Sequence, residues 1–256
     1  MIKMRNIRLK IEYDGTNYNG WQTQNNKNSA GLKDTIQQTI ETVLSNILQE
    51  HIKLIGSGRT DSGVHSLGQT ANFKTESEIS LKQIQRALNG LLPKDIVIAG
   101  VEETSLNFHS RFDALSKTYC YQILNCPHAS AFNRLYQYHI PYKLDHKLMQ
   151  KAARVLIGRK DFRSFQASDK RDRSSIRNIK KLSVKKQGHI IAIDIEADGF
   201  LYNMVRNIVG TLIEIGRGKL GPESIGDILN AKDRKRAGPT APAKGLCLMQ
   251  VKYQRD

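Results

Sequence analysis

Residues 56 to 65 bring together side chains whose types and spacing suit chemistry. They read Gly-Ser-Gly-Arg-Thr-Asp-Ser-Gly-Val-His and hold a guanidinium, a carboxylate and an imidazole among three glycines. Arg59 and Asp61 are two residues apart, so both side chains can aim near one point if the backbone is locally extended. A carboxylate beside a guanidinium stays ionised at neutral pH. Such an aspartate is suited to nucleophilic or acid–base catalysis, with Arg59 as its electrostatic partner.

Two other interpretations of this decapeptide stay open at this point. Gly, Ser, Thr and Asp are ordinary turn residues, so the composition is also typical of a surface turn. Asp61 and His65 are four residues apart, which raises the question of a metal site. A metal is disfavoured, because the stretch is predicted to be a loop rather than a helix and no third ligand lies nearby.

The decapeptide is expected to connect two strands. Before it, Ile52 and Leu54 alternate with polar residues, which predicts a short half-buried strand. After it, residues 67 to 73 predict a second strand. Glycines at three positions of the loop permit positive φ angles and close backbone approach.

These strands belong to a pattern that fills the first half of the chain. Ile96 to Val101 predicts its closing strand, and Ser80 to Gln83 predicts a capping box that opens the preceding helix. The opening strand alternates at Ile7, Leu9, Ile11 and Tyr13, and helical spacing follows at Leu32, Ile36, Ile40, Val43, Leu44 and Ile47. The order is β-α-β-β-α-β, the ferredoxin-like arrangement.

The second half repeats this order without visible sequence identity to the first. Strands are predicted at residues 119 to 123, 176 to 186, 190 to 196 and 246 to 253, and helices near 145 to 156, 203 to 215 and 221 to 229. We therefore expect an α+β fold of two ferredoxin-like halves with mainly antiparallel sheets, residues 1–105 and 106–256, joined around a central RNA-binding cleft. The boundary is placed at the turn-like stretch Glu102 to Asn107.

The charge distribution indicates a nucleic-acid partner. The net charge is +16, yet residues 1 to 105 carry 12 Lys and Arg against 11 Asp and Glu, while residues 106 to 256 carry 28 against 13. A phosphate backbone is the natural counterpart of such a surface, although a well-solvated basic surface stays an alternative. The densest cluster comprises Arg154, Arg159, Lys160, Arg163, Lys170, Arg171, Arg173, Arg177, Lys180, Lys181, Lys185 and Lys186.

Composition indicates an ordinary globular protein. The sequence contains no long apolar run of the kind that spans a membrane, and Met1 to Lys10 alternates like a strand rather than forming the apolar block of a signal peptide. We expect a cytoplasmic protein. Cys120, Cys126 and Cys247 are odd in number and lack metal spacing, which favours reduced thiols.

Three further segments carry candidate binding residues. Residues 13 to 22 contain two glycines and three aromatic residues, and Trp21 is interpreted either as a core anchor or as part of a wall that stacks on RNA bases. Tyr119 stands near the start of a strand, where a lone tyrosine is usually half-buried. The helix from Asn203 has a polar face at Asn203, Arg206, Asn207 and Gly210, which lacks the usual Lys and Glu of a solvated face.

The decapeptide closely resembles the active-site motif of the TruA family of RNA pseudouridine synthases. The sequence is also similar to that family in residues 13–22, 108–112 (Phe-His-Ser-Arg-Phe), 117–121 (Lys-Thr-Tyr-Cys-Tyr), 158–165, 204–210 and 237–246 (Ala-Gly-Pro-Thr-Ala-Pro-Ala-Lys-Gly-Leu). These motifs occur in the family's order along nearly the whole chain.

The resemblance implies roles for individual residues. It implies that Asp61 is the nucleophile or essential acid–base group and that Arg206 and Arg59 are cations close to it. The same resemblance implies that Tyr119 stacks on the target uracil. The remaining substrate-binding candidates are Tyr121, His65 and Trp21. Cys120 stands where the family often has a basic residue, so a phosphate contact at that position is not carried over.

The resemblance also implies a cofactor-free isomerase that forms homodimers and acts on uridine at positions 38 to 40 of the tRNA anticodon stem-loop. The reaction breaks the bond from C1′ to N1 of uridine and remakes it from C1′ to C5. No P-loop, dinucleotide fingerprint or zinc spacing is present in the sequence. The rivals are the same chemistry on another RNA, such as ribosomal RNA, and an RNA-binding protein without catalysis.

Overall fold

The computed structural model describes residues 3–23, 34–167 and 174–254, and the chain divides into two compact units. The first unit comprises Met1–Leu115 and Leu248–Asp256, and the second comprises Ser116–Cys247. Residues 106 to 115, beyond the expected boundary near 105, belong to the first unit because they bond to its sheet. Asn6 Nδ2 donates to Phe108 O at 3.0 Å, and Ser110 N donates to Asn72 Oδ1 at 2.9 Å.

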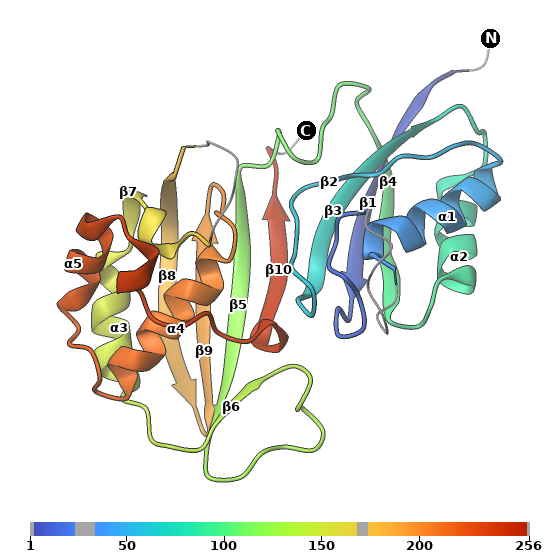
Figure 1. The fold of residues 1–256 in the computed structure, drawn as a ribbon. Helices are drawn as coiled ribbons and strands as arrows, with labels where there is room; N and C mark the ends of the chain where they lie inside the picture. Colours follow the sequence, from blue (N-terminus) through green and yellow to red (C-terminus); the bar gives the residue numbers. More distant parts are fainter. Residues whose placement is uncertain (1–2, 24–33, 168–173, 255–256) are drawn as a thin grey trace. The chain divides into compact units, whose positions relative to one another are not determined.

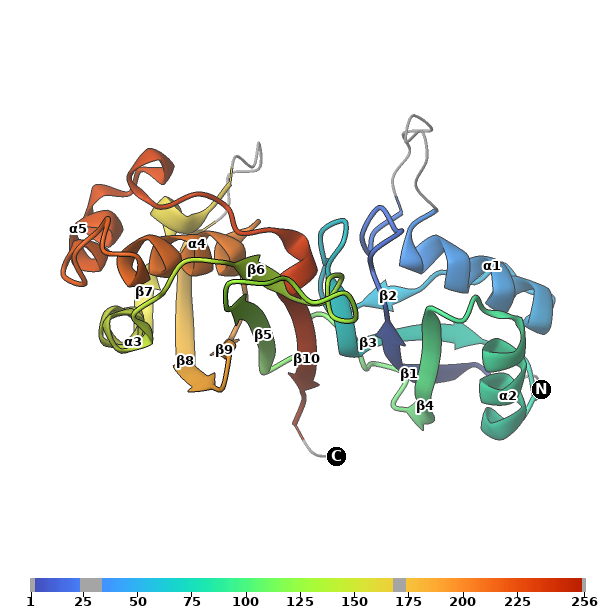
Figure 2. The same ribbon diagram turned by 90° about the horizontal axis from the view of Figure 1, so that it is seen from below.

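The first unit has the predicted ferredoxin-like order. Its elements are β1 (Arg5–Tyr13), α1 (Ile36–Leu48), β2 (Ile55–Gly56), β3 (His65–Thr75), α2 (Leu81–Leu91) and β4 (Ile96–Thr104). Strand β1 lies between β4 and β3, β2 pairs with β3, and all three pairings are antiparallel. The two helices pack on one face of this sheet (Figures 1 and 2).

Strand β2 is shorter and later than the strand predicted at Ile52 and Leu54. Both residues are buried at 3% exposure, as the alternation predicts. The backbone of Leu54, however, bonds to side chains of α1: its N–H donates to Glu41 Oε1 at 2.8 Å, and its carbonyl accepts from Gln37 Nε2 at 3.1 Å. Its polar backbone groups are therefore satisfied by a helix instead of a neighbouring strand.

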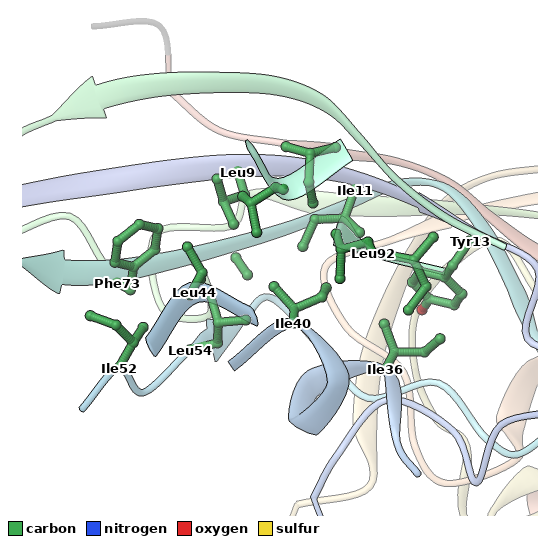
Figure 3. Close-up of a cluster of buried hydrophobic side chains, with 14 of the residues drawn as sticks. Leu9, Ile11, Tyr13, Ile36, Ile40, Leu44, Ile52, Leu54, Phe73 and Leu92 are labelled. Carbon is green, nitrogen blue, oxygen red and sulfur yellow. The ribbon is translucent and has the colours of Figure 1, made fainter. Parts of the chain in front are cut away.

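The core of the first unit lies between α1 and the sheet. Figure 3 shows Ile36, Ile40 and Leu44 on one side of α1, in the cluster that Leu9 and Ile11 of β1 complete. These apolar positions follow the 3.6-residue period of a helix. The helix begins at Ile36 because Thr35 caps it, accepting from Gln38 N at 3.3 Å. Leu32, predicted as part of this helix, lies outside the described residues.

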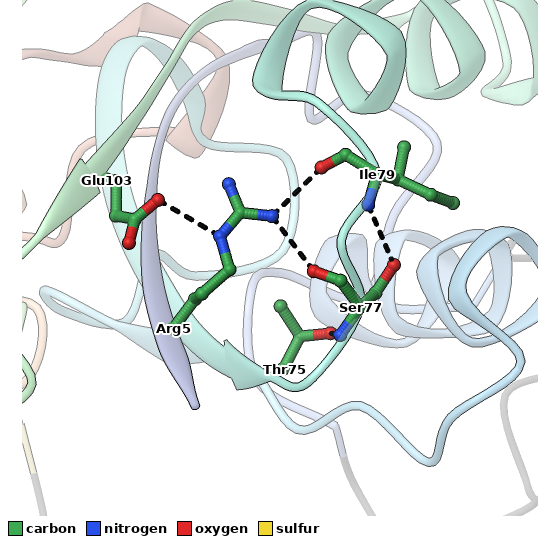
Figure 4. A network of polar contacts seen from close by, with 5 residues as sticks. All are labelled: Arg5, Thr75, Ser77, Ile79 and Glu103. Atoms are coloured by element: carbon green, nitrogen blue, oxygen red, sulfur yellow. Dashed lines mark hydrogen bonds and ion pairs between the residues drawn. The ribbon is translucent and has the colours of Figure 1, made fainter. Parts of the chain in front are cut away.

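A polar network fastens the connection between β3 and α2. Figure 4 shows Arg5 donating from Nη1 to the carbonyls of Ser77 and Ile79, each at 2.9 Å, while its Nε contacts Glu103 Oε2 at 3.0 Å. Helix α2 then opens with the predicted capping box between Ser80 and Gln83. These contacts satisfy backbone groups that a turn would otherwise leave open.

The second unit repeats the order with three additions, β6, β7 and α5. Its strands have the order β5-β9-β8-β7, with antiparallel pairing throughout, and β6 pairs with β5 in parallel. Helices α3 and α4 pack side by side on one face of these strands (Figures 1 and 2). The elements are β5 (Ser116–Asn125), β6 (Tyr138–Ile140), α3 (His146–Val155), β7 (Gly158–Asp161), β8 (Ile176–Gln187), β9 (Ile190–Ala197), α4 (Met204–Gly216) and α5 (Ser224–Ala231).

The last strand, β10 (Leu246–Lys252), begins in the second unit and continues in the first. Within the first unit, Ser66 Oγ donates to Leu248 O at 3.2 Å, and Leu115 N donates to Lys252 O at 2.8 Å. Among the described residues, no helix combines the length and the apolar character that a membrane span requires.

Candidate active site

The decapeptide is a loop whose buried and exposed residues are sharply divided. It leaves β2 at Gly56 and enters β3 at His65, as predicted. Ser57 and Thr60 are buried, whereas Arg59 is exposed and Asp61 is partly exposed. The guanidinium and the carboxylate that suit chemistry thus belong to residues that are at least partly exposed, while Ser57 and Thr60 are buried and anchor the loop.

The inner anchor of the loop is Gln69 of β3, which is fully buried. Its Oε1 accepts from Ser57 Oγ at 2.6 Å, and its Nε2 donates to Gly58 O at 2.9 Å. The backbone N–H of Ser57 also donates to Thr70 O at 2.8 Å. One buried amide thus fixes the two residues that precede Arg59.

The outer anchor is the segment of residues 13 to 22, which lies against the loop. Tyr13 Oη and Thr60 Oγ1 are 2.8 Å apart, Trp21 N donates to Thr60 O at 3.1 Å, and Ser62 Oγ donates to Tyr18 O at 2.9 Å. Gly20 has a φ of +80°, and a Cβ on it would lie 2.5 Å from Thr60 O. Glycine is required there because only a residue without a side chain allows this approach.

Two predicted substrate-binding residues are part of this anchor instead of an open surface. Trp21 is 1% exposed and its ring lies against Gly56, so it cannot stack on a base while the core stays closed. His65 is 6% exposed, and its Nδ1 accepts from Gly15 N at 3.1 Å and lies 3.1 Å from Asp14 Oδ1. Of the two interpretations of Trp21, the structure supports the core anchor.

A chain of side-chain hydrogen bonds reaches Arg59 from helix α1. Arg59 Nε donates to Gln22 Oε1 at 3.2 Å, Gln22 Nε2 donates to Gln37 Oε1 at 2.8 Å, and Gln37 Nε2 donates to Glu41 Oε1 at 2.8 Å. Gln37 is 5% exposed. Sequence reasoning missed this residue, because a glutamine in an amphipathic helix carries no signal of its buried partners.

The two candidate tyrosines of the second unit lie on β5. Tyr119 is 7% exposed and packs edge-on against Phe200, with ring centroids 5.1 Å apart at 88°. Tyr121 is fully buried, and its hydroxyl donates to Pro242 O at 2.8 Å. Burial raises the pKa of Tyr121 well above its usual range. Tyr121 therefore holds the chain at Pro242, and its ring is buried in this structure.

Arg206 on α4 is a fixed cation. Its Nε donates to Ala241 O at 2.7 Å, its Nη1 donates to Asn203 Oδ1 at 3.0 Å, and its backbone carbonyl accepts from Ala241 N at 3.1 Å. The guanidinium is partly exposed. The polar face predicted on this helix is thus covered by the segment of residues 237 to 243.

Two further residues, Asn207 and Arg234, hold that segment, and the sequence singles out only Asn207 of the two. Asn207 is fully buried, and its Oδ1 accepts from Arg234 Nη2 at 3.0 Å and from Thr240 Oγ1 at 2.6 Å. Burial lowers the pKa of Arg234. A Cβ on Gly210 would clash with Pro239 O, so glycine lets the segment lie directly on the helix. In the sequence, the motif at residues 237 to 246 is the signal that points to this segment.

The basic residues are spread over α3, β7 and β8. Lys180, Lys181, Lys185 and Lys186 lie on β8 and are exposed. Exposed Arg159 lies on β7, and exposed Arg163 lies in a short 3-10 turn of residues 163–165. Lys170, Arg171 and Arg173 lie outside the described residues. Within the described part of the chain, no group of three or more His, Cys, Asp or Glu side chains is placed to hold a metal ion.

These features define a two-unit α+β protein with one outward-facing acid on a doubly anchored loop. The family model described as "tRNA pseudouridine synthase" matches residues 10–113 and 152–254. The chain is 49% identical over 97% of its length to "tRNA pseudouridine synthase A 2" of Clostridium tetani, 99% of which is covered. It is 47% identical over 98% of its length to "tRNA pseudouridine synthase A" of Acetivibrio thermocellus, covered in full at 100%.

The chain therefore belongs to the tRNA pseudouridine synthase family, and it is an isomerase that converts uridine to pseudouridine in tRNA. A solved structure titled "Crystal Structure of a Cbf5-Nop10-Gar1 Complex" aligns with 96% of the chain and 48% of its own chain. The TM-score of that alignment is 0.34 at 12% identity.

Proposed function

We propose that Asp61 is the catalytic group of this isomerisation and that the target uridines lie in the tRNA anticodon stem-loop, at positions 38 to 40. The observation that supports the first part is the loop itself. Asp61 is turned outward while Ser57 and Thr60, on either side of Arg59, are buried and hydrogen-bonded. A carboxylate on a loop that is anchored by hydrogen bonds is suited to act on one atom of a bound substrate.

The reaction exchanges one bond of the uridine for another. The bond from C1′ to N1 breaks, a bond from C1′ to C5 forms, C5 loses a proton and N1 gains one, so no oxidant or reductant is required. One carboxylate serves any of three routes: attack at C1′, attack at uracil C6, or removal of a sugar proton. Each route uses the carboxylate in its ionised form.

Arg59, Arg206 and Tyr119 are proposed to serve the same reaction. The two arginines keep their charge at all physiological pH values and are held by acceptors on Gln22 and Ala241. Tyr119 is proposed to contact the extruded uracil, with Phe200 holding its ring. Extrusion of a base costs a few kcal/mol, and stacking offsets part of that cost.

Assembly and location are proposed on the same grounds. A homodimer in which one tRNA contacts both subunits is supported by the family resemblance and by the positive charge of the second half, which suits an RNA wider than one active site. A cytoplasmic location is supported by the nature of the substrate, because tRNA serves translation in that compartment.

The central test replaces Asp61. Asp61→Asn should abolish isomerisation, measured as tritium release from tRNA labelled at uridine C5, while the dissociation constant for tRNA stays within severalfold because phosphate contacts lie elsewhere. Asp34→Asn, which changes an exposed aspartate of the same unit, is the matched control and should keep full activity. More than a few per cent of wild-type activity in Asp61→Asn would overturn the assignment.

The choice of RNA is tested separately. Pseudouridine maps of total RNA from cells with and without the protein should differ at tRNA positions 38 to 40. A difference in ribosomal RNA would assign the same chemistry to another substrate. Identical maps, together with retained tRNA binding, would identify a binding protein without catalysis.

A further inference from the structure

The chain contains a long segment without acidic residues that interleaves aromatic and basic side chains. No Asp or Glu occurs between Asp113 and Asp145. Within this segment the β5–β6 loop, residues 126–137, connects two strands that pair with each other. The exposed aromatic and basic residues of the loop are His128, Phe132, Arg134 and Tyr136. Aromatic and cationic side chains without acids are typical of surfaces that bind single-stranded nucleic acid.

The base of the β5–β6 loop is firmly tied. Asn125 Nδ2 donates to Ile140 O at 3.1 Å and to Tyr142 O at 2.7 Å, so the residues on either side of the loop are bonded to each other. His139 Nε2 lies 2.9 Å from Cys126 O, within hydrogen-bond distance. Figure 1 shows the loop extending away from the strands that it connects. Its ends are therefore fixed while its middle projects.

The projecting part carries an exposed aromatic ring two residues before an arginine. Phe132 is 91% exposed, more than any other large apolar side chain described, and Tyr136 is 44% exposed. The backbone around them is ordered by local bonds: Asn133 N donates to Ser130 Oγ at 3.1 Å, and Arg134 Nη1 donates to Ala131 O at 2.7 Å. An ordered backbone lowers the entropic cost of presenting this ring to a planar partner.

The loop lies outside the part of the chain that the family model matches. That model covers residues 10–113 and 152–254, which include the anchored loop with Asp61 and the helix with Arg206. Residues 126–137 fall in the interval between these two ranges. Exposed loops commonly carry binding residues, so this loop is a candidate for contact with the RNA.

We propose that the β5–β6 loop binds tRNA away from the target uridine, with Phe132 stacking on an unpaired base and Arg134 contacting a neighbouring phosphate. The inference rests on the tRNA substrate described above. Every nucleobase has an apolar face that an exposed phenyl ring can cover, and the lack of acids leaves no repulsion against phosphate.

The experiment compares four substitutions of Phe132 and Phe112 in the full chain, with binding to intact tRNA as the readout. Phe132→Ala should raise the dissociation constant on the order of tenfold, Phe132→Trp should restore it, and Phe132→Leu should not, because leucine has no face for stacking. Phe112→Ala is the matched control, since Phe112 is 75% exposed but stands beside Asp113, and it should leave the dissociation constant unchanged.

A second substitution tests the phosphate contact. Arg134→Gln should reduce the slope of log affinity against log salt by about one, whereas Arg134→Lys should keep it. At saturating tRNA, the single-turnover rate of tritium release should equal that of the wild type in all these variants. The rate tests the proposed catalysis, and the dissociation constant tests binding by the loop. Failure of one proposal can therefore be distinguished from failure of the other.

Three outcomes would overturn the proposal. One is an unchanged dissociation constant in Phe132→Ala, and another is full restoration by Phe132→Leu, which would indicate apolar packing without stacking. The third is a change of oligomeric state in Phe132→Ala by sedimentation velocity with unaltered tRNA affinity, which would assign the loop to a second copy of the chain.

Discussion

At the scale of single residues, burial distinguishes candidate site residues that have similar side chains. Trp21 and Tyr121 have the chemistry of base-stacking residues, yet they are 1% and 0% exposed and serve as anchors. Arg206 has the chemistry of any surface arginine, yet two oxygens on Asn203 and Ala241 hold its guanidinium. What a side chain can do in this protein therefore depends on its burial and on its hydrogen-bond partners.

The fixed guanidinium leads to a prediction for Arg206→Lys. Lysine carries the same charge but cannot donate in two separate directions from a planar group, so the contacts with Ala241 O and Asn203 Oδ1 cannot both be kept. We expect single-turnover isomerisation to fall by at least tenfold, since a misplaced cation no longer stabilises the reacting groups.

Thermal unfolding of Arg206→Lys serves as the control for this experiment. It should stay within several degrees of the wild type, because one hydrogen bond from a charged donor contributes only about 1.5–3 kcal/mol. Near-normal turnover in Arg206→Lys would show that this arginine is a solvent-facing residue without a part in the reaction.

At the scale of elements, the loop with Asp61 depends on a strand that lies behind it. Gln69 bonds to Ser57 and Gly58, while residues 13 to 22 bond to Thr60 and Ser62. Removal of a buried partner leaves donors and acceptors unsatisfied, at a cost of about 1–3 kcal/mol for each group. The loop's position is therefore set by β3 as much as by its own sequence.

This dependence predicts a graded effect of two substitutions. Gln69→Leu should lower the single-turnover rate more than tenfold, because Ser57 Oγ and Gly58 O are both left without their partner. Ser57→Ala should have a smaller effect, since Gln69 Oε1 still accepts from Thr70 N at 3.2 Å. The tRNA dissociation constant should be unchanged in both. A lowered melting temperature with an unchanged rate in Gln69→Leu would show that Gln69 stabilises the fold but does not position the loop for the reaction.

The elements that the sequence predicts correctly are those whose signal is local. Alternation in β1 and the spacing of Ile36, Ile40 and Leu44 follow from one face of one element, and both are confirmed. The capping box at Ser80 is equally local and is confirmed. Strand β2 was placed too early, because the bonds that hold Leu54 come from a helix that precedes it by many residues.

The parts of the site that escaped prediction depend on contacts between distant stretches of sequence. Residues 237 to 243 were noted only as a motif, and their role follows from Gly210, on which Pro239 lies. Gln37 and Asn207 are amides whose partners no periodicity reveals. Periodicity reports which face is buried, and it does not report which buried polar group meets which partner.

At the scale of the whole molecule, the charge asymmetry is the main feature. Four exposed lysines of β8, Lys180, Lys181, Lys185 and Lys186, stand among the excess of positive charge in the second half. Each phosphate that a protein neutralises releases counterions, so the affinity of a basic surface for tRNA falls steeply as salt rises. These lysines are proposed as part of that surface.

The prediction is that changing these four lysines to Gln flattens the salt dependence of tRNA binding, by about one unit of log–log slope for each phosphate that is no longer neutralised. The same change at the exposed lysines Lys53, Lys74, Lys82 and Lys94 of the first unit is the matched control and should leave the slope as it is. Rates at saturating tRNA should match the wild type. If the slope of the β8 variant also stays at the wild-type value, the β8 lysines face solvent and do not contact tRNA.

The division of β10 between the two units has a consequence for how the protein is made. The unit that carries Asp61 includes residues 248–256 as well as residues 1–115. Tyr253 packs against Phe108 and donates to Ser110 O at 2.7 Å, and Gly68 lies against the backbone of Met249. As the chain leaves the ribosome from its first residue onward, the second unit has its whole sequence before the first does. The synthesis of the unit that carries Asp61 therefore begins first and ends last.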